Sequence, residues 1–134
     1  MAHFDEHCRD CERILGDRCE EANLWMDSAF DRYGPRHRFD RHHDEGINKA
    51  EELFGEMGRR AAIIHVLKDC GHIPTRSQWN NDEVDSLGMN PNSNFVGYWD
   101  PDEFKKRAVA LLYLDEARQK IVQENQIEKY RVKE

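Results

Sequence analysis

Apolar residues recur at helical spacing along most of the chain, and local start and stop signals divide this pattern into segments. The first apolar stripe consists of Phe4, Cys8, Cys11, Ile14 and Leu15. This spacing predicts a helix from Phe4 to Leu15, and Gly16 suits the position after its C-terminus. A second helix should follow at once, with Asp17 as its cap and "YGP" at 33–35 as its end. Its expected inner face consists of Leu24, Trp25, Ser28 and Ala29.

Two further helices are predicted in the middle of the chain. The third spans roughly 36–57, and its apolar stripe consists of Phe39, His43, Ile47, Ala50, Leu53 or Phe54, and Met57. This stripe places His43 on the buried side. The fourth helix, about 59–70, is apolar nearly all round in "AAIIHVL", which is typical of a central helix. Gly71 and Pro74 mark its end.

The last third of the chain combines a long loop with one strong helix signal. Residues 75–99 are rich in Asn, Asp, Gly and Ser, which predicts a short helical turn and an irregular loop. Asp100 as cap, Pro101 at the first position and Glu103 then begin a final helix. Its expected inner stripe consists of Phe104, Ala108, Leu111, Leu112, Ala117 and Ile121. The pattern predicts an all-α fold, a compact bundle of four to five helices with a long irregular loop before the last helix.

Length and composition limit the function classes. A chain of 134 residues corresponds to one domain, which we divide into residues 1–80, a loop at 81–100 and a C-terminal helix at 101–134. The net charge of −7 argues against nucleic acid as the main partner. No apolar run reaches the roughly 18 residues of a membrane span, and the first residues lack signal-peptide features. We therefore expect a cytoplasmic protein without a membrane partner, whose four cysteines are buried thiols or metal ligands rather than disulfides.

Histidine and aspartate gather on the third and fourth predicted helices. His65 and Asp69 lie one turn apart on the fourth helix, and the third carries "RHRFDRHHDEGIN" at 36–48. Imidazole and carboxylate groups are ligands that divalent transition metals accept. The predicted metal-binding set consists of His37, His42, His43, His65 and Asp69. The ion would be zinc, manganese, iron or nickel. The same residues fit a structural role equally, as hydrogen-bonded core histidines.

The segments "RHRFDRHHDEGI", "ELFG" and "HVLKDCGHIPTRSQW" resemble a family of small bacterial and phage-associated proteins catalogued as a domain of unknown function. The matching positions are Arg36, His37, Arg38, His42, Gly46, Ile47, His65, Val66, Asp69, Gly71, Ile73, Pro74 and Trp79. The resemblance covers roughly residues 1–80, with a shorter stretch between Gly55 and Ala62 than the family pattern. It implies that the histidine-rich segment belongs to a shared element, and it carries no activity to this chain.

A fainter similarity leaves an enzyme open. "HDEGINKA" at 43–50 resembles the His-Asp segment of HD-type metal-dependent phosphohydrolases. This similarity implies a ligand set of His7, His43, Asp44 and Asp69. Arg36, Arg38 and Arg41 would then bind the phosphate oxygens as an anion-binding group.

A third interpretation is a non-enzymatic interaction protein. The apolar residues of the last helix continue through Val122, Ile127 and Tyr130 while their surroundings become charged. This pattern fits an exposed arm, and it predicts an interaction protein that forms a homodimer through its C-terminal helix.

Overall fold

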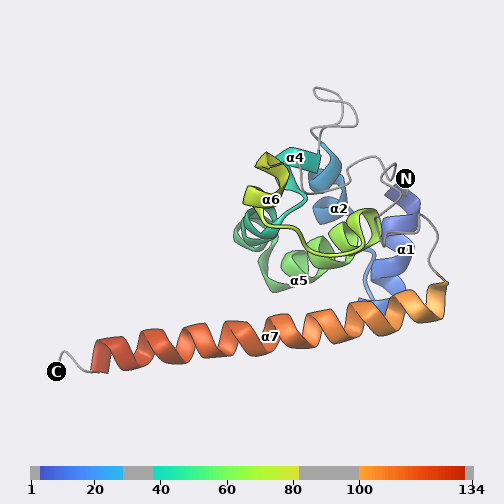
Figure 1. Cartoon of the computed structure of the whole chain (residues 1–134). Coiled ribbons are helices and arrows are strands. Elements are labelled where there is room, and N and C mark those ends of the chain that lie inside the picture. Colours follow the sequence, from blue (N-terminus) through green and yellow to red (C-terminus); the bar gives the residue numbers. More distant parts are fainter. Residues whose placement is uncertain (1–3, 29–37, 82–99, 132–134) are drawn as a thin grey trace.

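The computed structural model describes residues 4–28, 38–81 and 100–131, and these residues form helices without a strand among them. The helices are α1 (Phe4–Leu15), α2 (Glu20–Asp27), α4 (Arg38–Arg41), α5 (Asp44–Cys70), α6 (Arg76–Asn80) and α7 (Pro101–Arg131) (Figure 1). The all-α prediction is therefore confirmed. The predicted end of the second helix at 33–35 and residues 82–99 of the predicted loop lie outside the described residues.

The core forms on both sides of α5, which packs against α1, α2, α4 and α7. One buried cluster joins α5 to Met26 of α2 and Trp79 of α6. The other joins α5 to Cys11 of α1 and to Phe104 and Ala108 of α7. The nearly uniform apolar run in the second half of α5 is thus explained, because neighbouring helices cover it on more than one side.

The predicted continuous helix from 36 to 57 is wrong, because the chain turns at His42 and His43 between α4 and α5. His43 has an extended backbone (φ −158°, ψ 178°) and acts as the N-cap of α5. Its Nδ1 accepts a hydrogen bond from the Gly46 backbone N–H at 3.1 Å. The two helices meet so closely that a Cβ atom at Gly46 would lie 1.8 Å from the Arg41 carbonyl oxygen. Glycine at this position therefore permits the turn.

The predicted break between a third helix ending at Met57 and a fourth beginning at Arg59 exists, but it lies at Gly55 and takes the form of a kink within α5. α5 runs from Asp44 to Cys70 with a kink at Gly55, whose φ of 80° and ψ of −168° are not helical. Gly58 instead lies inside the helix and is buried. The C-terminus of α5 agrees with the prediction, since Gly71 has a φ of 79° and its N–H bonds to the Leu67 carbonyl.

The first helix is confirmed at both ends, but the second differs from its prediction. The Asp17 carboxylate accepts a hydrogen bond from the Cys19 N–H at 2.8 Å, and Cys19 itself occupies the N-cap position of α2. The predicted inner face is wrong at Leu24, which is 62% exposed, and at Ser28, which is also exposed, while Ala29 lies outside the described residues. The buried residues are instead Ala22, Asn23 and Met26. A polar residue, Asn23, thus points into the protein.

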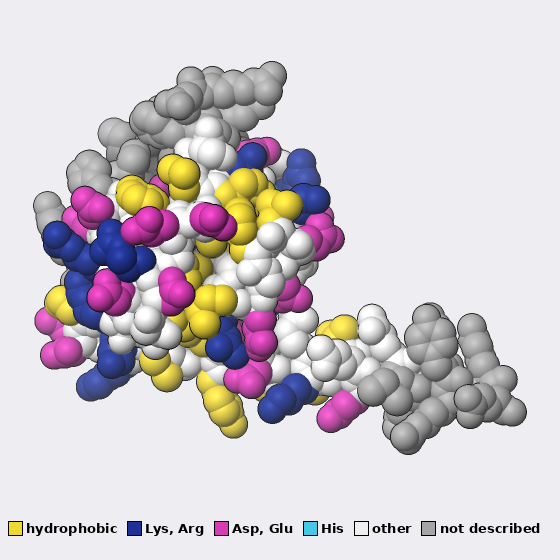
Figure 2. Space-filling model, turned by 180° about the vertical axis from the view of Figure 1, so that it is seen from behind, with side chains coloured by type: hydrophobic (Ala, Val, Ile, Leu, Met, Phe, Trp, Pro, Cys, Tyr) yellow, Lys and Arg dark blue, Asp and Glu magenta, His cyan; other side chains and the backbone are white. Residues whose placement is uncertain are grey.

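α7 begins as predicted, because the Asp100 carboxylate accepts a hydrogen bond from the Glu103 N–H at 3.1 Å. Its first half packs on the core, and its second half extends away from the other helices (Figure 1). The predicted inner stripe therefore fails at its end, where Ile121 is 56% exposed. From the opposite side, charged side chains of both signs surround scattered apolar ones, and α7 projects from the body (Figure 2). None of the described helices combines the length and apolar character needed to cross a membrane.

Candidate metal centre

Four metal-ligating side chains from three parts of the fold meet inside the protein. Asp27 is the last residue of α2, His42 lies in the turn before α5, and His65 and Asp69 lie one turn apart on α5. Each offers one ligand atom, and these atoms lie within 4.8 Å of one another. We call these four residues the His/Asp cluster. Such a cluster could hold a metal ion.

The nitrogen–oxygen distances within the cluster are similar. His42 Nε2 lies 3.5 Å from Asp27 Oδ1 and 3.3 Å from Asp69 Oδ2. His65 Nε2 lies 3.2 Å from the same oxygen of Asp27 and 3.5 Å from the same oxygen of Asp69. Two ring nitrogens thus face two carboxylate oxygens. The side chains of His42 and His65 are fully buried, that of Asp69 is nearly so, and Asp27 is 29% exposed and forms the side nearest to solvent.

His7 of α1 adds a third imidazole beside the cluster. Its ring stacks on that of His65 with 3.6 Å between centroids and 13° between planes. Its Nε2 lies 3.3 Å from Asp69 Oδ1, the carboxylate oxygen that does not face His42 and His65. His7 therefore fixes the orientation of the Asp69 carboxylate from behind.

Two hydrogen bonds to neighbouring residues orient the histidines of the cluster. Trp79 of α6 donates its indole N–H to the His42 carbonyl oxygen at 2.7 Å, which holds the turn between α4 and α5. Asn23 of α2 donates its Nδ2 to the Arg18 carbonyl oxygen at 3.1 Å, so its Oδ1 is the atom 2.9 Å from His65 Nδ1. An amide oxygen only accepts hydrogen bonds. His65 therefore carries a proton on Nδ1.

Burial and neighbouring charges shift the pKa values of His65, His42 and Asp69 in different directions. Burial and the nearby His7 lower the pKa of His65 to about 4. Burial also acts to lower the pKa of His42, but Asp27 and Asp69 outweigh it and raise that pKa above its ordinary value. Burial acts to raise the pKa of Asp69, but interactions with His42 and His7 hold it well below the usual range. Asp69 is therefore ionised.

Three residues of the predicted metal-binding set, His42, His65 and Asp69, belong to the cluster. His43 is buried as expected, but the cluster does not include it, because its Nδ1 caps α5 and its Nε2 lies 3.0 Å from the Asp40 carbonyl oxygen. His37 lies outside the described residues. Helical spacing placed His43 correctly on the buried side, but it could not show which of the two histidines reaches the cluster, because the backbone at His42 and His43 is not helical.

The ligand set implied by the HD resemblance is only partly brought together. His7 and Asp69 are in contact, whereas the Asp44 side chain is 52% exposed at the start of α5. Arg36 and the Arg38 side chain lie outside what the structure describes. The third member of the anion-binding group, Arg41, is engaged by Asp40 at 3.1 Å and lies 4.2 Å from the centroid of the Trp25 ring.

Asp27 is the member of the His/Asp cluster that the sequence pattern did not predict. It lies one helical turn after Asn23, and the pair interrupts the apolar residues of α2 with two polar side chains on one face. This spacing was the available signal. It was hidden because Leu24 and Trp25 were assigned to the inner face, which rotates Asn23 and Asp27 toward solvent.

Comparisons with family models, with curated proteins and with solved structures found no match for this chain. The resemblance to the bacterial and phage-associated family therefore stays a prediction.

Proposed function

We propose that the protein binds one divalent transition-metal ion, best zinc, through Asp27, His42, His65 and Asp69. Such an ion would join α2, the turn before α5 and the second half of α5. The two carboxylates supply the negative charge that balances a divalent cation, and the two imidazoles supply the nitrogen ligands that zinc favours.

The observation that carries this proposal is the protonation of His65. Because Nδ1 donates its proton to Asn23, the neutral ring has only a lone pair on Nε2. That lone pair faces the carboxylate oxygens of Asp27 at 3.2 Å and Asp69 at 3.5 Å. Three acceptors directed at one another repel unless a proton or a cation lies between them. The lowered pKa of His65 disfavours a proton on its Nε2, so this lone pair is available to a cation. The raised pKa of His42 favours a proton on that ring in the metal-free protein, and a bound divalent ion would take the place of this proton between the carboxylates.

The spacing of the ligand atoms supports four-coordinate binding. Ligand atoms about 2.0–2.1 Å from a tetrahedral zinc ion lie about 3.3–3.4 Å from each other. The four nitrogen–oxygen distances of the cluster lie between 3.2 and 3.5 Å. An octahedral ion with ligands at about 2.0–2.1 Å would bring neighbouring ligand atoms to about 2.9 Å. The other two pairs of ligand atoms lie within 4.8 Å, and the two imidazole nitrogens, rather than the spacing alone, favour zinc over magnesium, which prefers oxygen ligands.

The neighbouring residues are those that a metal site requires. Metal-bound histidines commonly donate their other ring N–H to an oxygen, and bound carboxylates are commonly held by a further partner. Asn23 and His7 make these contacts with His65 and Asp69 respectively.

Metal content and titration test the proposal. The full-length protein, purified without a histidine tag, should contain close to one equivalent of a transition metal, or take up one equivalent of Zn²⁺ after treatment with a chelator. His42→Gln should reduce the zinc affinity at least about tenfold, because it replaces a nitrogen ligand. His72→Gln is the matched control, since His72 is exposed and bonds only to the nearby Cys70 carbonyl oxygen in the described structure.

A protein that holds and takes up no metal would refute the proposal and leave the cluster as a set of structural His–Asp pairs. Equal loss of affinity in both histidine variants would also argue against this assignment. Circular dichroism of each metal-free variant separates loss of a ligand from loss of the fold.

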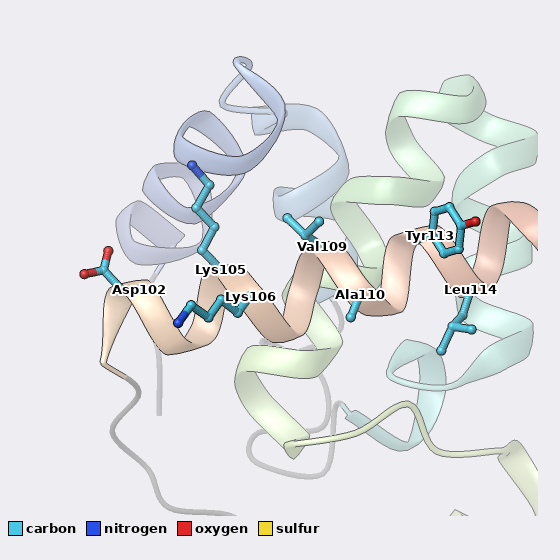
Figure 3. Close-up of a pocket in the computed structure, with 7 residues that line it drawn as sticks. All are labelled: Asp102, Lys105, Lys106, Val109, Ala110, Tyr113 and Leu114. Carbon is cyan, nitrogen blue, oxygen red and sulfur yellow. The ribbon is translucent and has the colours of Figure 1, made fainter.

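A second function, self-association through α7, is favoured by the exposed side of that helix. Large apolar side chains lie there in the open, with Val109 48%, Tyr113 73% and Ile121 56% exposed. Val109, Ala110, Tyr113 and Leu114 line a shallow groove together with Lys105, Lys106 and Asp102 (Figure 3). A single helix of this length that leaves the body gains little stability without a partner.

The occupant we infer is a second copy of the chain, with the two α7 helices antiparallel. The exposed stripe places Lys106 near its beginning and Glu124 near its end, and antiparallel pairing centred near Asp115 sets these opposite charges against each other. The same pairing places Val109 against Ile121 and Tyr113 against the small Ala117. Charge and apolar character are thus both self-complementary.

A charge exchange tests this pairing. Wild-type protein should sediment as a dimer, and Lys106→Glu should shift the equilibrium toward monomer. The double variant Lys106→Glu with Glu124→Lys should restore the dimer, because it re-forms the pair with reversed signs. A wild-type protein that stays monomeric at about 100 µM, a concentration where weak dimers form, would rule out self-association. Failure of the double variant to recover would rule out this register.

A further inference from the structure

We propose that Cys11 and Cys19 are a thiol oxidation site, which forms an intramolecular disulfide when a hydroperoxide reaches Cys19. Cys11 lies on α1 and Cys19 at the start of α2, and both belong to or pack on the same buried cluster. Both thiols are free. The sequence had predicted buried thiols or metal ligands, rather than a disulfide, for all four cysteines.

Cys19 packs against the buried cluster that contains Cys11, and the two thiols differ in pKa and exposure. Interaction with Cys19, together with burial, raises the pKa of Cys11, whereas interaction with Cys11 lowers the pKa of Cys19 against the effect of burial. Cys19 therefore has the larger thiolate fraction, and the thiolate is the form that attacks peroxides. Cys11 is completely buried, whereas Cys19 is partly exposed and lines a surface hollow of about 490 Å³. A small oxidant can thus reach the more reactive of the two sulfurs first.

The backbone at Cys19 is another reason to assign its side chain a function. Its φ of 51° and ψ of 47° are left-handed, a conformation that among the described non-glycine residues occurs only here. Glycine or asparagine fits this region at lower cost than cysteine does. Local structure alone therefore gives no reason for a cysteine at this turn, whereas its contact with Cys11 does.

The oxidation proceeds in two balanced steps. The Cys19 thiolate attacks the terminal oxygen of a hydroperoxide, so a sulfur–oxygen bond forms, the oxygen–oxygen bond breaks and an alcohol or water leaves with one proton. Cys19 is thereby oxidised by two electrons to the sulfenic acid. The Cys11 thiol then attacks the Cys19 sulfur, the disulfide forms, and the sulfenic oxygen leaves as water with the Cys11 proton.

The disulfide should also change the zinc affinity of the proposed metal site. This second part of the inference rests on the proposed function. Asn23 Nδ2 lies 3.4 Å from Cys11 Sγ, and the same side chain accepts from His65 Nδ1 at 2.9 Å. Oxidation moves the Cys11 sulfur toward Cys19 and changes the partner of Asn23. Partners of metal-bound histidines typically change affinity about 10- to 100-fold when they are lost, so a shifted partner should weaken zinc binding about threefold to tenfold.

Peptide mapping after oxidation tests the disulfide. One equivalent of hydrogen peroxide should convert the full-length protein to a form that contains a Cys11–Cys19 linked peptide and that dithiothreitol reverses. Cys19→Ser should abolish the link and slow thiol loss at least about fivefold, because the most reactive thiolate is removed. In Cys11→Ser, dimedone should trap a sulfenic acid at Cys19. Cys70→Ser is the matched control, since Cys70 is buried in the other core cluster.

A linked Cys8–Cys11 peptide, or oxidation that spares Cys19 in the wild-type protein, would overturn the assignment without reliance on any variant. The coupling has its own readout: zinc affinity of the oxidised and the reduced wild-type protein, measured by competition with a chromophoric chelator. Equal affinities overturn the coupling and leave the disulfide intact. A protein that binds no zinc in either state contradicts the proposed function instead, while the peptide map still decides on the oxidation site.

Discussion

Replacing Asp27 with asparagine should remove most of the thermal stabilisation that zinc gives the protein. Asp27 supplies one oxygen to both histidines of the cluster, at 3.2 and 3.5 Å. Its side chain is partly exposed, so the amide is accommodated without a buried cavity. The variant therefore tests metal binding with little direct damage to the fold.

The expected magnitude follows from ligand linkage. Free zinc at 100 times its Kd stabilises a one-site protein by about 2.7 kcal/mol. An unfolding entropy of about 2 cal/mol/K per residue gives 134 residues about 0.3 kcal/mol/K, so the Tm should rise by about 10 °C. If loss of the Asp27 ligand weakens binding about 100-fold, the same zinc concentration equals the new Kd and stabilises by only about 0.4 kcal/mol. The Tm shift should then be about 1–2 °C.

Differential scanning fluorimetry with and without zinc provides the assay. Asp44→Asn is the matched control, because Asp44 is an exposed carboxylate beside His43 and not a member of the cluster. It should keep the full zinc-induced shift. Equal shifts in Asp27→Asn and the wild-type protein would refute the assignment of Asp27 as a ligand. Loss of the shift in Asp44→Asn alone would instead favour the ligand set implied by the HD resemblance.

Three further predictions concern the elements that build the site. Gly46→Ala should destabilise the protein by more than about 3 kcal/mol in urea unfolding, because its Cβ would lie 1.8 Å from the Arg41 carbonyl oxygen; a change below about 1 kcal/mol would contradict the close approach. Trp79→Phe should cost about 1–3 kcal/mol and weaken zinc binding, since it leaves the buried His42 carbonyl without the indole donor at 2.7 Å; unchanged zinc affinity would show that this bond does not position the ligand. In the metal-free protein, the pKa of His65 falls from 6.5 to about 4, so the unfolded state binds more protons between these values and the free energy of unfolding should decrease as the pH is lowered through this window. His65→Gln should flatten that dependence in chemical denaturation, and an equally steep dependence would assign it to other groups.

Local chemistry determined several features that the sequence predicts correctly. α1 ends where a glycine permits positive φ, and α7 begins where Asp100 caps the Glu103 N–H. These signals act over a few residues, so they do not depend on what packs nearby. His65 and Asp69 were likewise predictable as a pair, because one helical turn separates them within a continuous helix.

Tertiary structure decided which residues complete the site. His42 rather than His43 faces His65 because the chain leaves the helical conformation there, so helical spacing predicted the burial of His43 but not which of the two histidines meets His65. That turn requires close contact between α4 and α5, which the Gly46 position permits. The sequence shows a glycine at position 46, but it does not predict that the Arg41 backbone packs against it.

Asp27, His7 and the Cys11–Cys19 pair illustrate the same limit. Each becomes significant only through a partner on another helix: His65 for Asp27, Asp69 for His7, and α2 for the thiol of α1. Hydrophobic periodicity predicts that a side chain is turned inward, but it carries no information on which inward side chains of different helices meet. That choice depends on how α1, α2 and α5 pack together, because only their packing brings polar groups from distant parts of the sequence within contact distance.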